Sequence, residues 1–131
     1  MTNYDLSHWI WGEPRGGTPP IEFEDEYLSF FHSSFKRNGI WLYVMGAYTF
    51  EKKHPFNITS FSRYPIIFKE LYSAPLINTA DKNKRVIYPS GAFLSENKQD
   101  LVVFCGENDS AIRVMKIDPE ILKLTLKSFK N

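Results

Sequence analysis

Hydrophobic and polar positions alternate along most of this chain, which is the pattern of half-buried β-strands rather than of amphipathic helices. The first alternating runs follow closely on one another, and short polar turns separate them. Gly39 lies in one of these turns, where we expect it to adopt the positive φ that tight hairpins require. The predicted strands of this first set span residues 20–23, 26–35, 40–51 and 56–61.

A second set of strands follows a connecting stretch that contains proline, asparagine and basic residues. The Asp-Pro-Glu sequence at 118–120 then favours a helix start, because aspartate caps a helix and proline fits its first turn. The short amphipathic tail after it carries Ile121, Leu122, Leu124 and Leu126. The predicted strands of the second set span residues 85–94, 100–106 and 110–117.

These elements predict an all-β fold with a short C-terminal helix. A chain of 131 residues suffices for one domain with a real core but not for two ordinary domains. The two sets have a similar order of strands and turns, at an offset of roughly 70 residues. This order suits repeated blades of four antiparallel strands. We expect an N-terminal arm (1–18), a first blade (19–70), a connector (71–84), a second blade (85–118) and a helical tail (119–131).

Composition narrows the class of partner. The formal net charge is +1, so no overall field attracts nucleic acid or an anionic membrane, and we expect neither partner. Cys105 is the single cysteine and follows an apolar run, which predicts a buried, inert thiol in a reducing compartment. Three scattered histidines give no recognised metal-ligand spacing. No stretch has the pattern of a signal segment or membrane helix, so we expect a cytoplasmic protein.

The candidate chemistry lies near the N-terminus. Arg15 is followed by two glycines, and His32 lies within the long aromatic strand that comes next. Arginine forms paired hydrogen bonds with anions, glycine permits unusual backbone angles, and histidine adds a further polar contact. We interpret this stretch as a candidate site for a sugar or phosphate. The alternatives are a surface arginine that fixes a loop and a core histidine that bonds a backbone carbonyl.

Five short motifs occur in a fixed order: RGGTPPI at 15–21, YLSFFH at 27–32, YVMGAY at 43–48, YPSGA at 88–92 and VFCGENDS at 103–110. This series covers most of residues 12–118. It resembles the last blades of the five-bladed propellers of mannoside phosphorylases and β-mannosidases (glycoside hydrolase family 130). It is also similar to the propeller regions attached to some bacterial and viral glycosyltransferases.

The resemblance implies a partial β-propeller of two to two-and-a-half blades that binds a mannoside-like glycoside in its funnel. It implies that Arg15 and His32 hold inorganic phosphate, which would be a co-substrate, since no cofactor is expected. It also implies that Asp109 contacts the sugar, although a plain turn aspartate fits that position equally well. Tyr48 and Gly91 complete the expected sugar-binding residues, and core packing is the alternative for Tyr48.

The catalytic acid of that family lies in an earlier blade that this chain does not contain, so no catalytic residue is assigned. A lone arc of blades exposes apolar sheet faces and open edges, which favours a homo-oligomer or a partner chain that completes the propeller. With those blades supplied, we expect phosphorolysis or hydrolysis of a β-mannoside-like bond. The alternatives are a non-catalytic accessory module of a glycosyltransferase system and an inactive remnant.

Overall fold

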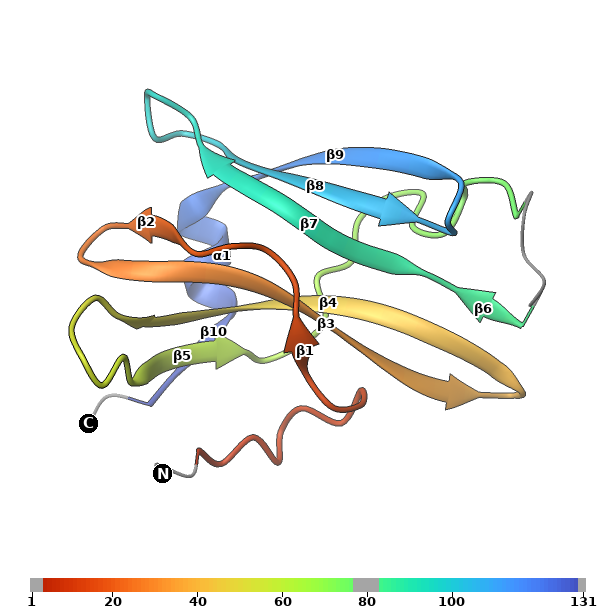
Figure 1. Cartoon of the computed structure of the whole chain (residues 1–131), viewed down its shortest axis with the longest axis horizontal. Helices are drawn as coiled ribbons and strands as arrows, with labels where there is room; N and C mark the ends of the chain where they lie inside the picture. The colour runs from red at the N-terminus through yellow and green to blue at the C-terminus, as the bar shows by residue number, and fades with distance from the viewer. Residues whose placement is uncertain (1–3, 77–82, 130–131) are drawn as a thin grey trace.

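The computed structural model describes residues 4–76 and 83–129. It has a mostly β fold with antiparallel sheets and one short helix near the C-terminus, as the sequence pattern predicts (Figure 1). Residues 77–82 of the predicted connector lie outside the described residues. The strands form one seven-stranded sheet and one three-stranded sheet.

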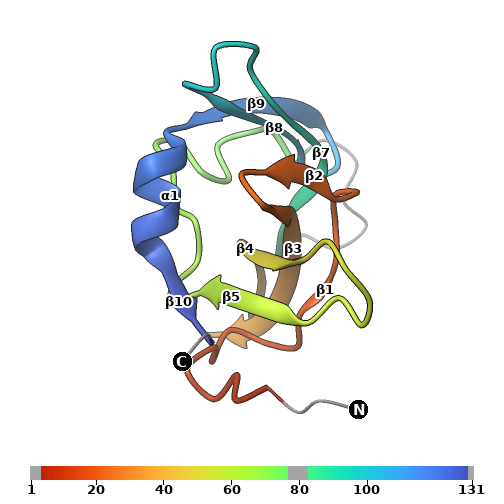
Figure 2. The same cartoon turned by 90° about the vertical axis from the view of Figure 1, so that its left-hand side faces the viewer.

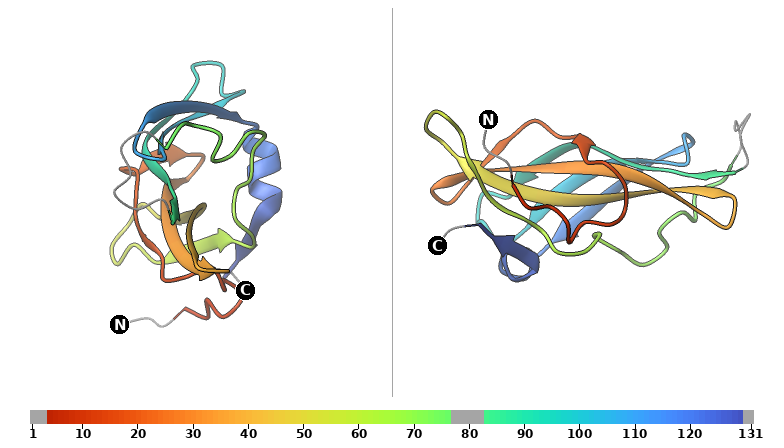
Figure 3. Two further views of the ribbon diagram at one scale, coloured as in Figure 1. Left: turned by 90° about the vertical axis from the view of Figure 1, so that its right-hand side faces the viewer. Right: turned by 90° about the horizontal axis from the view of Figure 1, so that it is seen from below.

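The centre of the larger sheet is an antiparallel meander of four consecutive strands, which are the four predicted for the first set. The long β3–β4 hairpin turns at Gly39, whose φ of 79° confirms the expected positive value. Both strands of this hairpin run along the length of the molecule (Figure 3). The meander consists of β2 (Ile21–Phe23), β3 (Glu26–Arg37), β4 (Ile40–Glu51) and β5 (Ile58–Ser62).

Three very short strands complete the larger sheet and were not predicted. β1 (Arg15–Gly16) pairs with β3, and β10 (Leu126–Ser128) pairs with β5, both antiparallel. β6 (Lys84–Arg85) pairs with β4 in parallel. Two residues are too few to display an alternating period, and the three residues of β10 fall within the predicted helical tail, so the sequence pattern predicts no separate strand at these places.

The smaller sheet contains β7 (Ile87–Leu94), β8 (Leu101–Glu107) and β9 (Ala111–Ile117) in that order. Among the described residues, β9 pairs with β8 alone, so its other edge is unpaired. Figure 2 shows this sheet facing the larger one, with α1 (Pro119–Thr125) running from the end of β9 towards β10. The two sheets and the helix therefore enclose the core between them.

The main core consists of side chains that both sheets direct inwards. Leu28 and Phe30 of β3 pack with Met45 of β4 and with Ile87 of β7. Cys105 of β8 belongs to the same cluster and is fully buried, as predicted. Burial, and secondarily the negative charge of Glu107, raises the pKa of the Cys105 thiol to about 11, so the thiol stays protonated.

The N-terminal arm covers the outward face of the larger sheet. Trp9 is buried there, and its ring packs edge-on against Phe31 and Phe61. Its indole Nε1 donates a hydrogen bond to Ser33 Oγ at 3.1 Å. Trp9 is therefore a core residue that fixes the arm to the sheet.

The helix begins as the sequence predicts. Asp118 caps it by accepting a hydrogen bond from the Glu120 backbone N–H at 2.9 Å, and Pro119 occupies the first turn. Leu122 is buried against the core, whereas Ile121 and Leu124 are 59% and 80% exposed. One apolar face of the helix is therefore left uncovered.

Candidate functional site

The segment that starts at Arg15 is fastened to β3 by hydrogen bonds. β1 pairs with β3 so that Arg15 lies opposite His32. Further along, the Thr18 backbone N–H donates to the Phe30 carbonyl at 3.0 Å, and the Phe30 N–H donates to Thr18 Oγ1 at 2.9 Å. Arg15 and His32, which the sequence interpretation combined into one site, are thus cross-strand neighbours.

Gly17 is required by close packing. A Cβ atom added there would lie 2.5 Å from the Phe30 carbonyl oxygen and 3.0 Å from the Pro89 side chain. Neither Gly16 nor Gly17 has a positive φ, so the backbone freedom that glycine permits is not used here. The segment is extended because it pairs with β3, and the missing side chain of Gly17 lets it lie directly on that strand.

His32 lies where the two sheets meet. Its side chain is only 8% exposed, and its ring lies parallel to that of Tyr43, with 6.3 Å between centroids. Tyr88 comes from β7 in the smaller sheet, and its ring centroid is 4.5 Å from that of His32. Tyr88 is 43% exposed, so the group opens to solvent on its side. We refer to Arg15, His32, Tyr43 and Tyr88 as the His32 cluster.

The electrostatics of the cluster favour a neutral imidazole. Burial lowers the pKa of His32 and outweighs the hydrogen bond to the Gly16 backbone, which raises it. The positive charge of Arg15 lowers this pKa further. The buried Nδ1 of His32 has no hydrogen-bond partner among the residues that the structure describes. In a neutral imidazole one ring nitrogen is an acceptor, and an unpartnered Nδ1 in that role can be satisfied by a hydroxyl group.

Arg15 itself is exposed on the edge strand β1. Within residues 4–76 and 83–129, no carboxylate forms an ion pair with its guanidinium. Its five N–H donors are therefore available for an oxygen-rich ligand beside His32.

Asp109 lies in the tight turn between β8 and β9, where its φ is 54°. Its side chain is exposed and lines a shallow hollow that Gly106 also lines. Gly106 is the cross-strand neighbour of Tyr88, so this hollow starts beside the His32 cluster. Among the described residues, no ion pair joins Asp109 to Arg15 or His32.

Two residues that the sequence interpretation did not single out hold this turn in place. Glu107 is fully buried, and its carboxylate accepts hydrogen bonds from the backbone N–H groups of Tyr72 at 3.2 Å and Ala74 at 2.9 Å. Arg113 Nε donates to the same carboxylate at 3.0 Å. Asn108 donates from Nδ2 to the carbonyls of Tyr72 and Ala74. The Asp109 turn is therefore anchored to the segment that contains Tyr72 and Ala74, which precedes the smaller sheet in the chain.

Tyr48 and Gly91 lie elsewhere. Tyr48 is on the opposite face of the larger sheet from His32, where its ring stacks near Phe61 with 6.3 Å between centroids. There it lines a hollow of about 240 Å³ together with Arg15. Gly91 pairs with Phe104 on β8 and faces away from the core. The structure therefore does not gather the five predicted residues into one site.

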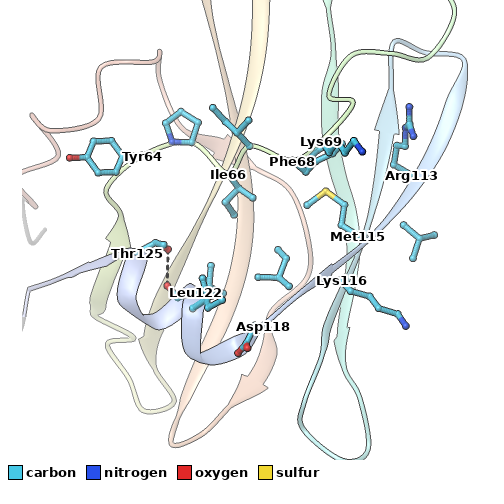
Figure 4. A pocket seen from close by; sticks show the side chains of 15 residues that line it. Tyr64, Ile66, Phe68, Lys69, Arg113, Met115, Lys116, Asp118, Leu122 and Thr125 are labelled. Carbon is cyan, nitrogen blue, oxygen red and sulfur yellow. Dashed lines mark hydrogen bonds between the residues drawn. The ribbon is translucent and has the colours of Figure 1, made fainter.

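A larger cavity, of about 710 Å³, lies between β9, α1 and the segment 64–69. Figure 4 shows Ile66, Met115 and Leu122 projecting into it from these three elements. Its lining is mostly apolar, and Lys69 and Lys116 also border it. The sequence interpretation did not predict this cavity, because it depends on how the helix packs beside a strand edge.

Comparison with protein-family models and with curated proteins gives no match. The family resemblance of the sequence therefore rests on its five motifs alone. No helix in the described ranges is long and apolar enough to cross a membrane.

Proposed function

We propose that this chain is a carbohydrate-binding, propeller-type domain whose His32 cluster holds a mannoside-like sugar. The observation that carries the proposal is the buried His32 ring beside the exposed Arg15, because its Nδ1 has no hydrogen-bond partner within residues 4–76 and 83–129. Buried polar atoms are almost always hydrogen-bonded, so an unsatisfied one in an aromatic cluster with an exposed arginine beside it favours a ligand.

The chemistry of the cluster suits a polyol. A sugar hydroxyl donates to the neutral His32 Nδ1, and Arg15 donates to neighbouring sugar oxygens. The half-exposed ring of Tyr88 offers an apolar surface to the C–H face of a pyranose. Inorganic phosphate would accept from Arg15 as well, but a phosphate contact favours a protonated His32, which burial opposes. At neutral pH we therefore expect the sugar to bind more tightly than phosphate.

For the chain by itself, we propose sugar binding without catalysis. Glycoside cleavage uses two carboxyl groups that flank the scissile bond. None of the four residues of the His32 cluster carries a carboxyl group, and no ion pair of the described residues joins Asp109 to Arg15 or His32. An accessory role in a glycosyltransferase system requires only the binding site.

A second candidate function is phosphorolysis or hydrolysis of a β-mannoside-like bond in an assembly that supplies the missing carboxylate. What favours it is Asp109, an exposed carboxylate on a turn that Glu107 and Asn108 anchor firmly. Pre-organised groups of this kind suit a site that must orient a sugar.

The test is isothermal titration of the purified chain with methyl mannoside and, separately, with inorganic phosphate. We expect Arg15→Ala and His32→Gln each to weaken mannoside binding at least about tenfold, which corresponds to about 1.4 kcal/mol. Arg37→Ala, which removes an exposed arginine at the far end of β3, is the matched control and leaves affinity unchanged. Equal affinity in all four proteins, or no mannoside binding at millimolar concentration, contradicts the proposal, provided that thermal unfolding shows the variants to be folded.

A further inference from the structure

The exposed apolar side chains of this chain concentrate around one strand, β9. Two of them lie on β9 itself, two on the segment 64–69 and two on α1. Tyr64, Ile67 and Ile121 line the 710 Å³ cavity beside the strand, and Figure 4 labels Tyr64 there. The six residues and their exposed fractions are Ile112 (79%), Val114 (58%), Tyr64 (68%), Ile67 (74%), Ile121 (59%) and Leu124 (80%).

One edge of β9 has no strand partner in the described structure. The strand pairs with β8 alone among the described residues, so alternate backbone N–H and C=O groups point away from the sheet. Natural edge strands are usually blunted by proline, by a bulge, by being very short, by charged side chains or by a covering helix or loop. Of these devices, β9 carries charged side chains, Arg113 and Lys116. It contains no proline, runs for seven residues and pairs with β8 without a bulge. An apolar surface and a free backbone edge therefore coincide at this strand.

The exposed apolar area around β9 is similar in size to an interface with another protein. Residues of these types expose about 150–220 Å² when fully accessible, so the six exposed fractions sum to roughly 750 Å². This matches the roughly 800 Å² per partner of a standard specific interface.

One antiparallel register of two β9 strands avoids placing like charges directly opposite each other. If two copies of β9 pair antiparallel about the strand's midpoint, Val114 lies opposite its own copy and all seven residues are paired. Lys116 then lies opposite Ile112, and Arg113 opposite Met115, so no two cations face each other. In other registers fewer residues pair, or Arg113 faces its own copy.

We propose that a second copy of this chain docks here, with β9 pairing antiparallel to β9 about a two-fold axis at Val114. The two smaller sheets then form one continuous six-stranded sheet, and the apolar residues around β9 are buried on both of its faces. The arrangement is a closed, isologous dimer, because each copy offers the same strand in the same register. It does not depend on the sugar site, which lies at the β1 and β7 side of the molecule.

The first test is light scattering on the full chain. We expect a concentration-dependent species of twice the 15.3 kDa chain mass. Val114→Lys and Val114→Glu should each be monomeric, because each places like charges face to face at the axis. An equimolar mixture of the two variants should recover the dimer, which also shows that both are folded. Ile10→Lys, at another exposed apolar residue, is the control and stays dimeric.

The second test is disulfide cross-linking, which reads the register directly. Val114→Cys should form a cross-linked dimer under mild oxidation, since both kinds of antiparallel pair hold Cα atoms within disulfide range. Ile112→Cys should not, because its two copies would be roughly 13 Å apart, four residues along the strand. A monomeric parent chain, a dimeric Val114→Lys variant, or equal cross-linking of the two cysteine variants each overturns the proposal. A parent dimer that survives Val114→Lys would indicate a different face.

Discussion

Removal of the Glu107 carboxylate is expected to be the most damaging single change to this fold outside the apolar core. Glu107→Ala deletes an acceptor that is fully buried and serves two backbone N–H groups and one guanidinium. Each buried N–H left without a partner costs about 1–3 kcal/mol. Breaking a buried ion pair by removing one partner costs about 3–5 kcal/mol. Because the contacts overlap and Arg113 keeps part of its hydration, we expect a loss of about 3–5 kcal/mol in the free energy of unfolding.

Glu70→Ala is the matched control, since it removes the other carboxylate near the same arginine. Glu70 Oε2 lies 3.9 Å from Arg113 Nη1, and its side chain is 63% exposed. Exposed pairs of this kind contribute about 0–1 kcal/mol. Both variants remove a carboxylate near Arg113, but only Glu107→Ala is expected to lower the free energy of unfolding strongly.

The assay is urea unfolding followed by tryptophan fluorescence and by circular dichroism, with coincident transitions as the check on two-state behaviour. For a chain of this size, the expected loss in Glu107→Ala corresponds to a fall in Tm of roughly 10–20 °C. Glu107→Gln should be intermediate, because its amide oxygen still accepts from a backbone N–H. If Glu107→Ala and Glu70→Ala lower stability equally, by less than about 1 kcal/mol, the anchoring role assigned to Glu107 is refuted.

Two further outcomes follow from titratable groups. Because burial lowers the pKa of His32 in the folded state, the unfolded chain binds the additional proton more readily, so the parent should lose more stability than His32→Gln between pH 7.5 and 5.5. Parallel losses in the two proteins, measured by urea unfolding at both pH values, would contradict this. Because the pKa of the Cys105 thiol is raised to about 11, the native protein should resist iodoacetamide at pH 8 and react fully in urea. Rapid alkylation of the native chain, detected by mass spectrometry, would contradict its burial.

The strands that the sequence predicts well are those that alternate over at least four or five residues. The predicted range 40–51 coincides with β4, and the predicted helix start is the observed cap of α1. β1 and β6 are missed because each has too few residues for a period, β10 is missed because it falls within the predicted helical tail, and only their partners define them. Their formation is a property of the packed sheet rather than of the local sequence.

The candidate site, like the fold, is predicted from the sequence only in part. Arg15 and His32 are predicted together because one segment lies on the next strand, but Tyr88 joins them only through contact between the two sheets. The separation of Tyr48 from His32 was accessible from the sequence. Once the turn at Gly39 fixes the hairpin register, strand alternation places Tyr48 and His32 on opposite faces.

The pairing of β10 with β5 also bears on how the chain folds. Leu126 bonds to the strand that contains Ser62, and in between the chain builds the whole smaller sheet and α1. A contact between positions so distant in sequence carries a large loop-closure entropy, so it forms late. Until it forms, the outer edge of β5 is open to other chains. The refolding yield of this protein should therefore depend on protein concentration more strongly than the stability of its finished fold suggests.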